Sequence, residues 1–401
     1  MRTCDFVIIG AGVVGLTIAL ELKRRLPESG IILLEKEPEP GRHSSGRNSG
    51  VLHSGIYYPP NSLKAQVCGQ GAKEMAAYCL ERGLPLNRIG KVLLPLRAEE
   101  GPQLDLLEHR AGVNGVEVER IDEAKLARIE PEARSATGEA LFVPGTSVVS
   151  SSDVLASIVA DAKAAGIELL CGSSLGAVDA ETRTLTWGDE RISYGHAINT
   201  AGLHADSVAH KFGVGERYTL LPFKGIYWKL DPASGLKINH LIYPVPDLRV
   251  PFLGVHTTTA IDGTVYVGPT AVPAFGRENY RGLQGVSGGE LVRILSHLGR
   301  QYLSGRNGFR RLAWQEGRRY LKPWFADAAR QLLPRLKPEH LLPCTKVGIR
   351  AQMLDRESGE LVTDFLVEGG PASTHVLNAI SPAFTSAFPF ARHVCDTNIL
   401  R

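Results

Sequence analysis

A glycine-rich turn between two apolar segments near the start of the chain constrains the fold most. Residues 5–15 read DFVIIGAGVVG and residues 31–35 read IILLE. This pattern predicts a buried strand, a tight turn, a helix and a second buried strand that ends in an acid. Gly10 permits the turn, Gly12 lets backbone N–H groups approach a pyrophosphate, and Gly15 lets the helix pack closely on the strand.

The same pattern is typical of a dinucleotide-binding unit. The partial positive charge at the helix N-terminus favours phosphate groups. Glu35 lies about twenty residues beyond Gly15, where a carboxylate accepts hydrogen bonds from ribose hydroxyls and disfavours a 2′-phosphate. We therefore do not expect NADP. The motif alone leaves NAD, FAD and a glycine turn that binds nothing as alternatives.

Composition indicates an ordinary globular protein of more than one domain. A chain of 401 residues is too long for one compact core, and 43% hydrophobic with 22% charged residues is a common balance. A net charge of +3 is too small to indicate nucleic-acid binding. The six cysteines contain no CxxC pair, which argues against a zinc knuckle and suits a reducing compartment.

Nothing in the sequence predicts a segment that crosses a membrane. The apolar start of the chain is explained better by strand, turn and helix than by a signal peptide. No later run reaches about eighteen consecutive apolar residues. We expect a cytoplasmic protein, with peripheral attachment to the inner face of a membrane left open.

Periodicity predicts the further elements. Helices are expected at 62–82, 103–111, 123–129, 151–165, 288–303 and 324–333, strands at 91–96, 141–143, 147–149, 167–171, 196–202 and 376–380, and a hairpin joins 183–187 to 190–194. Several short strands between residues 220 and 267 alternate with Pro, Gly and Asp turns, as in an antiparallel sheet. Parallel-type and antiparallel segments are therefore interleaved along the chain.

Several longer motifs carry a resemblance to a known family. They are GRHSSGRNSGVLHSGIYY at 41–58, LIYPVP at 241–246, PFLGVH at 251–256, VGP at 267–269, GIRAQ at 348–352 and LNAISPA at 377–383. With them the chain resembles the D-amino-acid-oxidase-like superfamily of FAD-dependent oxidoreductases, and most of all the L-2-hydroxyglutarate dehydrogenase/oxidase family. Two departures are Cys344–Val347, where a small glycine-containing turn is expected, and Phe384, where a smaller residue is usual.

The resemblance implies a fold of mixed α/β and α+β class. An FAD-binding Rossmann-like domain would be assembled from discontinuous segments, 1–85, 146–215 and 341–401. An antiparallel-sheet substrate domain would be built from 86–145 and 216–340. FAD is expected to be bound without a covalent link.

The residues expected at FAD follow from the glycine motif and from the resemblance. They are Gly10, Gly12, Val14, Gly15, Glu35, Lys36, Ser44, Ser45, Asn48, Ser49, Gly50, Val178, Ala201, Gly202, Arg350, Ser381, Ala383, Phe384 and Thr385. For many of them, such as Val178, a role in the core is the alternative. No metal site is expected.

Oxidation of a 2-hydroxy acid needs a base for the hydroxyl proton and cations for the carboxylates. Histidine suits the first task because it titrates near working pH, and His53 and His256 lie in the family-like motifs. Arginine binds carboxylate in bidentate fashion, which makes Arg350 the favoured anchor. Further candidates for substrate contact are Lys224, Arg277, Tyr58 and Tyr243, each of which could instead be structural.

The expected reaction is oxidation of a small 2-hydroxy acid, foremost L-2-hydroxyglutarate to 2-oxoglutarate, with dioxygen or a quinone as electron acceptor. One alternative is an amine or amino-acid oxidase of the same superfamily. Others are a flavoprotein subunit without turnover and an NAD-dependent dehydrogenase.

Overall fold

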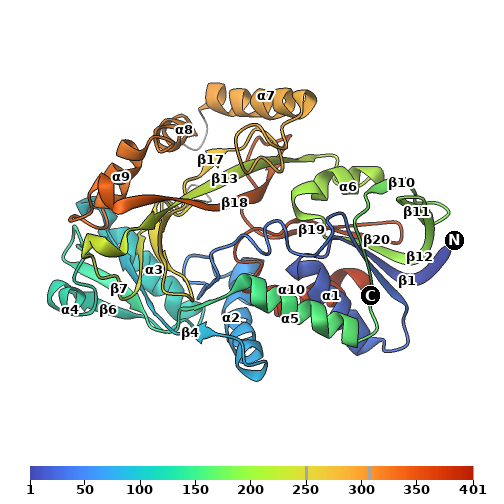
Figure 1. The fold of residues 1–401 in the computed structure, drawn as a ribbon, viewed down its shortest axis with the longest axis horizontal. Coiled ribbons are helices and arrows are strands. Elements are labelled where there is room, and N and C mark those ends of the chain that lie inside the picture. Colours follow the sequence, from blue (N-terminus) through green and yellow to red (C-terminus); the bar gives the residue numbers. More distant parts are fainter. Residues whose placement is uncertain (249–251, 306–308, 401) are drawn as a thin grey trace.

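The computed structural model describes residues 1–248, 252–305 and 309–400, so Pro251 of the predicted PFLGVH motif lies outside the described residues. Two lobes lie side by side, and the chain passes between them several times (Figure 1). The N- and C-termini both lie in the lobe that contains the glycine motif (Figure 1). This mixed architecture agrees with the predicted fold class.

The first lobe is built on a sheet in which β1 lies near the centre. Its strands run in the order β10-β11-β12-β1-β2-β9, and β20 pairs with both β12 and β19. The pairs that β1 makes with β2 and β12 are parallel, as are β2–β9 and β12–β20. The bounds are β1 (Arg2–Ile9), β2 (Ile31–Glu35), β9 (Glu168–Cys171), β10 (Leu175–Asp179), β11 (Thr184–Trp187), β12 (Glu190–Asn199), β19 (Leu366–Gly370) and β20 (Ser373–Asn378).

Helices cover both faces of this sheet, which explains why the last four residues of β1 and the first four of β2 are apolar and buried. All five residues of β2 are buried. The helices α1 (Val13–Arg25), α2 (Leu63–Glu81), α5 (Ser151–Ala164) and α10 (Ala387–Val394) lie on one side, and α6 (Ala205–Lys211) lies on the other (Figure 1). The carboxyl ends of β1 and β12 therefore meet at one edge, next to the N-terminus of α1.

The second lobe is dominated by two long antiparallel strands, β13 (Tyr218–Leu230) and β18 (Leu341–Asp355). Their sheet also contains β15 (His256–Thr259), β16 (Val265–Gly268) and β17 (Val272–Pro273). A second sheet has the order β14-β5-β7-β6, with β14 (Leu241–Pro244), β5 (Lys91–Leu94), β7 (Glu139–Val143) and β6 (Glu119–Asp122). The pair β14–β5 is parallel, whereas the sequence predicted only antiparallel pairing here.

Shorter elements complete the described chain. A small sheet joins β3 (Val51–Leu52), β8 (Ser147–Val149) and β4 (Leu86–Asn87). The helices of the second lobe are α3 (Gly101–Val113), α4 (Glu123–Ile129), α7 (Gly288–Ser304), α8 (Phe309–Arg318) and α9 (Lys322–Arg330). α7, α8 and α9 follow one another along the upper and left rim of the molecule (Figure 1).

The predicted helices are present, most with bounds shifted by a few residues, and three of the described helices, α6, α8 and α10, were not predicted. α10 contains Pro389 and two phenylalanines, which are weak helix formers. Packing stabilises it instead, because Phe390 and Val394 are fully buried against neighbouring helices. α8 was missed because its ten residues carry few apolar positions. Residues 341–355 were assigned to the FAD-binding domain, but they pair with β13 along most of its length.

The close contact of α1 with β1 depends on the absence of a side chain at Gly15. A Cβ atom there would overlap the carbonyl oxygen of Gly10 and lie 2.6 Å from Thr200 Oγ1. We expect Gly15→Ala to lower the free energy of unfolding by about 1–3 kcal/mol, because the obstacle is backbone that cannot move aside. Denaturant unfolding measures the change.

Gly112, inside α3, is the matched control because a Cβ there would meet nothing within 4 Å. Gly112→Ala should leave stability unchanged or raise it by up to about 1 kcal/mol. Equal stability of the natural chain and Gly15→Ala would show that α1 does not pack as closely as described.

Candidate active site

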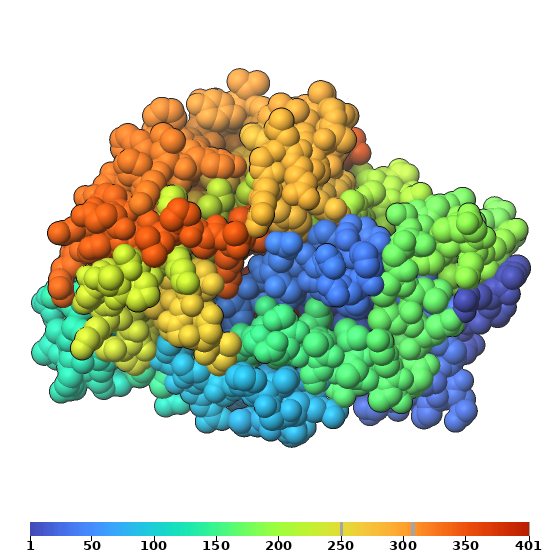
Figure 2. Space-filling view, viewed as in Figure 1, coloured from blue at the N-terminus to red at the C-terminus, as the bar shows by residue number. Residues whose placement is uncertain are grey.

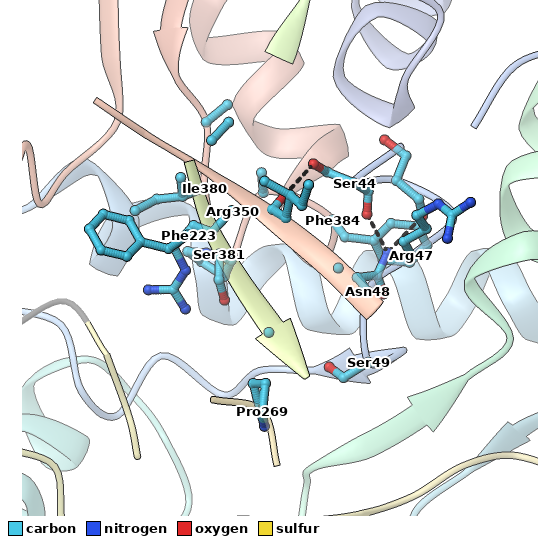
Figure 3. Close-up of a pocket in the computed structure, with 18 of the residues that line it drawn as sticks. Ser44, Arg47, Asn48, Ser49, Phe223, Pro269, Arg350, Ile380, Ser381 and Phe384 are labelled. Atoms are coloured by element: carbon cyan, nitrogen blue, oxygen red, sulfur yellow. Dashed lines mark hydrogen bonds between the residues drawn. The ribbon is translucent and has the colours of Figure 1, made fainter. Parts of the chain in front are cut away.

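A cavity between the two lobes gathers most of the motifs that carried the resemblance. Its wall combines the N-terminus of α1, the 44–49 loop, β13, β18 and the segment after β20. Figure 3 shows Arg350 and Ser381 close together, on the other side of the cavity from Ser44 and Arg47. The segments that form this wall are separated by hundreds of residues in sequence.

The 44–49 loop is fixed between the two lobes by its own hydroxyl and amide groups. Ser45 Oγ accepts a hydrogen bond from the backbone N–H of Val13 at 2.9 Å. Ser44 Oγ donates to the carbonyl oxygen of Ile349 at 3.1 Å, and Asn48 Nδ2 donates to the carbonyl of Ser45 at 2.7 Å. The loop therefore links the start of α1 to β18.

The N-terminus of α1 presents partial positive charge to this cavity. Its cap is Gly12, which has no side chain, its first turn contains no acid, and the Val13 N–H is bonded to the neutral hydroxyl group of Ser45. A Cβ on Gly12 would lie 2.9 Å from Ser45 Oγ, so only glycine leaves this close approach open. Gly12 and Val14 both line the cavity. Such a helix end is suited to a pyrophosphate.

Glu35 is held in the position expected of a ribose acceptor. Its side chain is buried, Oε2 accepts the backbone N–H of Ala11 at 3.1 Å, and Oε1 accepts that of Glu37 at 3.0 Å. These bonds fix the carboxylate at the carboxyl ends of β1 and β2. With the glycine turn, it completes a set of groups that fits a dinucleotide.

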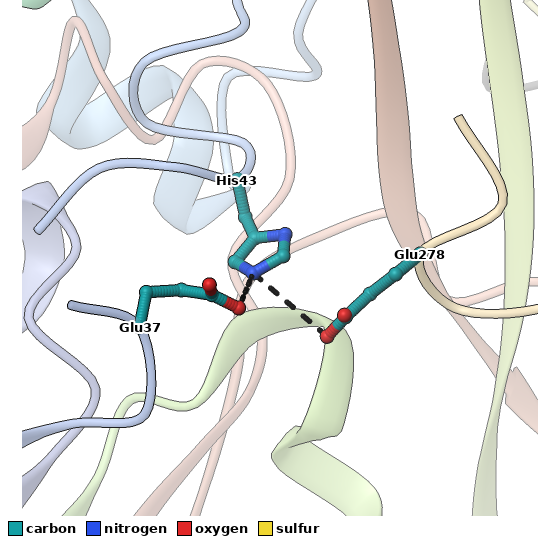
Figure 4. A group of neighbouring side chains, drawn as sticks. All are labelled: Glu37, His43 and Glu278. Carbon is teal, nitrogen blue, oxygen red and sulfur yellow. Dashed lines mark hydrogen bonds and ion pairs between the residues drawn. The ribbon is translucent and has the colours of Figure 1, made fainter. Parts of the chain in front are cut away.

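An ion-pair network lies beside this edge of the sheet and joins the two lobes (Figure 4). His43 Nε2 lies 2.9 Å from a carboxylate oxygen of Glu37, and Lys36 Nζ pairs with both Glu37 and Glu278. A hydrogen bond from His204, followed by one from Lys36, lowers the pKa of Glu278 to about 2. Because an ammonium group already stands between the carboxylates, we assign this cluster to structure and not to metal binding.

His256 is oriented so that one ring nitrogen is available to a ligand. Its Nδ1 lies 2.9 Å from the carbonyl oxygen of Gly254, so Nδ1 carries the proton and Nε2 keeps its lone pair. The ring centroid lies 3.9 Å from that of Tyr243. Burial, and then the charges of Lys91 and Arg350, lower the pKa of His256 to about 4 against the opposing effect of the Gly254 bond. The imidazole is therefore neutral near pH 7.

His53 lies near His256 and also lines the cavity. Its backbone N–H donates to Thr385 Oγ1 at 3.1 Å, and its carbonyl accepts the thiol of Cys68 at 3.2 Å. Its Nδ1 is buried without a hydrogen-bond partner within the part of the chain that the structure describes. Burial, followed by the charges of Lys91, His256 and Arg350, lowers the pKa of His53 to about 3.

Arg350 enters the cavity wall from β18, where it stands opposite Phe223 of β13. Its guanidinium carbon lies 5.1 Å from the centroid of the Phe252 ring. Burial lowers the pKa of Arg350, while Tyr58 and Tyr227 act in the opposite direction. An arginine remains charged despite such a shift, so it places a fixed cation beside the two histidines.

Lys91 is a second buried cation, and sequence reasoning did not identify it. It begins β5, is completely buried, and its Nζ has no hydrogen-bond partner among the described residues. The ammonium lies 4.7 Å from the ring centroid of Tyr57 and 5.4 Å from that of Tyr243, which lines the cavity. The only signal in the sequence was a charge at the start of the apolar run KVLLPL.

The structure places fifteen of the predicted site residues on the cavity wall. They are Gly12, Val14, Ser44, Ser45, Asn48, Ser49, His53, Gly202, Tyr243, His256, Arg350, Ser381, Ala383, Phe384 and Thr385. The wall also contains residues that were not predicted, among them Arg47, Phe223, Tyr227, Phe252 and Glu316. Phe384, one of the two departures from the family pattern, therefore does face the cavity.

Other predicted residues lie elsewhere. Gly10, Gly15, Glu35, Lys36, Gly50, Tyr58, Val178, Ala201 and Lys224 are not on the cavity wall. Lys224 Nζ donates to Asn279 Oδ1 at 2.9 Å, and Arg277 pairs with Asp206 and Glu290. Neither of these two candidate anchors faces the cavity. Lys91 does not line it either, but its charge acts on both His53 and His256, which makes Lys91 the better candidate for the second cation.

Comparison with known proteins agrees with this geometry. The family described as FAD dependent oxidoreductase matches residues 5–397. L-2-hydroxyglutarate dehydrogenase of Escherichia coli K12 is 36% identical over 403 residues, covering 97% of this chain and 92% of that protein. The human mitochondrial L-2-hydroxyglutarate dehydrogenase is 34% identical over 416 residues, covering 98% and 88%.

Solved structures show the same fold at lower sequence identity. L-alpha-glycerophosphate oxidase from Mycoplasma pneumoniae with FAD bound has a TM-score of 0.77 at 20% identity, covering 98% of this chain and 94% of that one. Glycine oxidase from Geobacillus kaustophilus has a TM-score of 0.71 at 17% identity, covering 99% and 94%. Identities this low carry information on the fold alone.

The burial of Lys91 makes a testable prediction about stability. Burial lowers the pKa of Lys91 to about 7, against about 10.4 in an unfolded chain. Between these values the unfolded state binds the extra proton, so the stability of the natural chain should rise with pH. Lys91→Met should be the more stable protein at pH 7, and its advantage should shrink by about 1 kcal/mol per pH unit up to about pH 10.

Denaturant unfolding at several pH values measures this difference. Lys73→Met is the matched control, because Lys73 is exposed on α2. A pH-independent gap between Lys91→Met and the natural chain would contradict the burial of a charged ammonium.

Proposed function

This chain belongs to the FAD-dependent oxidoreductase family, and from that premise we propose that it oxidises L-2-hydroxyglutarate to 2-oxoglutarate. The observation that carries the proposal is the pair of neutral imidazoles, His53 and His256, which line the cavity with Arg350 and are affected by the charges of both Arg350 and Lys91. A dianionic hydroxy acid needs a base and a positive field in the same place. The dehydrogenase relatives, which match over nearly the whole chain, support this choice of substrate.

The residues present fit FAD. The α1 N-terminus, Ser45 and Ser49 would hold the pyrophosphate, and Glu35 would bind the ribose. Ser381 and Thr385 would lie along the isoalloxazine edge. When bound, FAD supplies the acceptor for a hydride from carbon.

We assign the base to His256. The hydroxyl group of the substrate would donate its proton to His256 Nε2, the nitrogen left free by the bond from Nδ1 to Gly254. As the C2–H hydrogen leaves as hydride, the carbon–oxygen double bond of 2-oxoglutarate forms. The substrate thus loses one hydride and one proton, which together are two electrons and two protons. Tyr243 would keep the ring in place through its contact at 3.9 Å.

The two cations have different tasks. Arg350 is on the cavity wall, where its planar fork would bind one carboxylate of the substrate. Lys91 is sealed behind Tyr57 and Tyr243, so it would act through its field on the other carboxylate and on the imidazoles. Both charges help keep the histidines deprotonated.

Dioxygen or a quinone would then take the electrons. A quinone acceptor would place the protein at a membrane, which is compatible with peripheral attachment from the cytoplasmic side.

The proposed function is tested by the anaerobic visible spectrum of the FAD-loaded protein. Addition of L-2-hydroxyglutarate should bleach the flavin band, and D-2-hydroxyglutarate should not. Bleaching by glycine, proline or glutamate instead would indicate that the protein is an amine or amino-acid oxidase and would overturn the proposal. A flavin band that no hydroxy acid or amine bleaches would indicate a subunit without turnover.

The base can be identified from its pH dependence. Because the pKa of His256 is lowered to about 4, kcat/KM for flavin reduction should stay level from neutral pH down to about pH 5 and fall below it. His256→Gln should slow reduction by about 10²–10⁴-fold at pH 7. Stopped-flow absorbance gives both results.

His53→Gln is the paired variant. Reduction that is slow in His53→Gln and normal in His256→Gln would transfer the role of base to His53. Normal reduction in both would remove histidine from that role.

Arg350 is tested through substrate binding. Arg350→Met should raise KM by about 100-fold, since a charge-assisted bidentate contact is lost while the phosphate-binding segments are untouched. Arg300→Met, at an exposed position of α7, is the control and should leave KM unchanged. Retained FAD with unchanged KM in Arg350→Met would exclude Arg350 as the anchor.

A further inference from the structure

The segment 288–330, which forms α7, α8 and α9, has a composition unlike the rest of the chain. It holds nine of the 45 basic residues and three of the 42 acidic ones. Its net charge is therefore +6, whereas the net charge of the remaining residues is −3. It also holds eight of the fifteen large hydrophobic side chains that are exposed among the described residues: Val292, Leu295, Tyr302, Leu303, Trp314, Tyr320, Leu321 and Trp324. Basic and apolar groups are therefore concentrated together in this segment, whose orange atoms form the upper and left rim of the molecule in Figure 2.

The exposed apolar residues of α7 form one stripe. Val292, Leu295, Tyr302 and Leu303 are spaced so that they fall within about 100° of one another around a helix of 3.6 residues per turn. Val292 is 68% exposed and Leu303 is 75% exposed. Ile294, on the opposite side of the helix, is fully buried. α7 thus packs inward through Ile294 and the partly buried Leu298 and leaves a larger apolar stripe outside.

α8 and α9 continue this surface with tryptophan and arginine. Trp314 is 65% exposed, and the guanidinium of Arg318 lies 5.3 Å from its ring and 4.7 Å from that of Trp324. Arg310 and Arg311 are exposed one turn before Trp314. Tryptophan beside arginine on an amphipathic helix is the composition of segments that lie in the interface of a bilayer.

A second cavity opens beside this surface. Arg311, Arg318 and Trp324 are part of its wall. It shares Phe252, Leu253, Gly254 and Glu316 with the cavity that contains Arg350 and His256. The rim formed by α8 and α9 therefore leads toward the candidate active site.

The charge of the segment selects among the partners that could cover it. In a symmetric contact with a second copy of this chain, two segments that each have a net charge of +6 would face and repel each other. None of the helices that the structure describes is long and apolar enough to cross a bilayer. An anionic bilayer surface offers both the negative charge and the apolar layer that these helices match.

We propose that α7, α8 and α9 form a docking face for an anionic lipid bilayer. The stripe on α7 and the two tryptophans enter the interfacial layer, and the arginines bind lipid phosphates. The mouth of the second cavity then opens at the lipid surface. Docking itself does not depend on the proposed function. If the proposed function holds, docking would allow electrons to reach an acceptor dissolved in the bilayer.

Co-sedimentation of the FAD-loaded protein with vesicles tests the proposal. The protein should pellet with phosphatidylcholine vesicles that contain phosphatidylglycerol, pellet far less with phosphatidylcholine alone, and be released by salt. Leu295→Gln/Leu303→Gln/Trp314→Gln should lower the bound fraction by on the order of tenfold, as should Arg300→Gln/Arg311→Gln. Leu80→Gln, at an exposed apolar position of α2, is the matched control and should bind normally.

Flavin bleaching by L-2-hydroxyglutarate is measured on the same samples without vesicles. It should be equal in all of these variants, so a failure of docking is distinguished from a failure of the proposed function. Absence of binding to anionic vesicles, or equal binding by the triple variant and the natural chain, would overturn the proposal. So would a dimer in light scattering that the triple variant converts to monomers without any binding to vesicles.

Discussion

The pairing of β13 with β18 is the constraint on which the rest of the site depends. Tyr218 pairs with Asp355 at one end of the ladder, and Leu230 pairs with Leu341 at the other. Because the ladder fixes the register, Arg350 stands opposite Phe223 and Gly348 stands opposite Gly225. A Cβ on Gly348 would lie 2.8 Å from the carbonyl oxygen of Arg47, so the loop that contains Arg47 can approach β18 this closely only because residue 348 is glycine.

The electrostatics of the cavity follow from burial. Burial is the main reason that the pKa values of His53 and His256 are lowered, and the charges of Lys91 and Arg350 lower them further. A buried ammonium without a partner, such as Lys91, is costly and is not expected in a purely structural role. A dianionic substrate would compensate this cost. The buried positive charge would therefore both destabilise the empty site and favour binding of the substrate.

Local sequence was sufficient for the Rossmann-like unit and insufficient for the substrate side. The turn at Gly10, the helix that follows it and Glu35 lie within one short segment, and each has a direct physical signature. Lys224 was named as a candidate for substrate contact and Lys91 was not, yet the Lys224 side chain donates to Asn279. The direction of a side chain on a strand depends on register with partners far away in sequence, and no single-sequence pattern specifies that register.

The same reasoning explains the elements that were missed. α10 is helical because Phe390 and Val394 find apolar neighbours on other helices, which propensity alone does not indicate. The spacing of apolar residues predicted the helix α7, but this spacing does not say which face of the helix packs against the protein. Whether apolar residues face the core or the solvent became clear only when the sheets were in place.

The central claim is that a dianion is recognised between Arg350 and Lys91. The most direct test compares anaerobic flavin reduction by L-2-hydroxyglutarate with reduction by L-2-hydroxypentanoate, which has the same carbon chain without the second carboxylate. The account predicts that the dicarboxylate is favoured in kcat/KM by about 100-fold or more, and that Lys91→Met loses most of this preference. Equal kcat/KM for the two acids in the natural chain would contradict it.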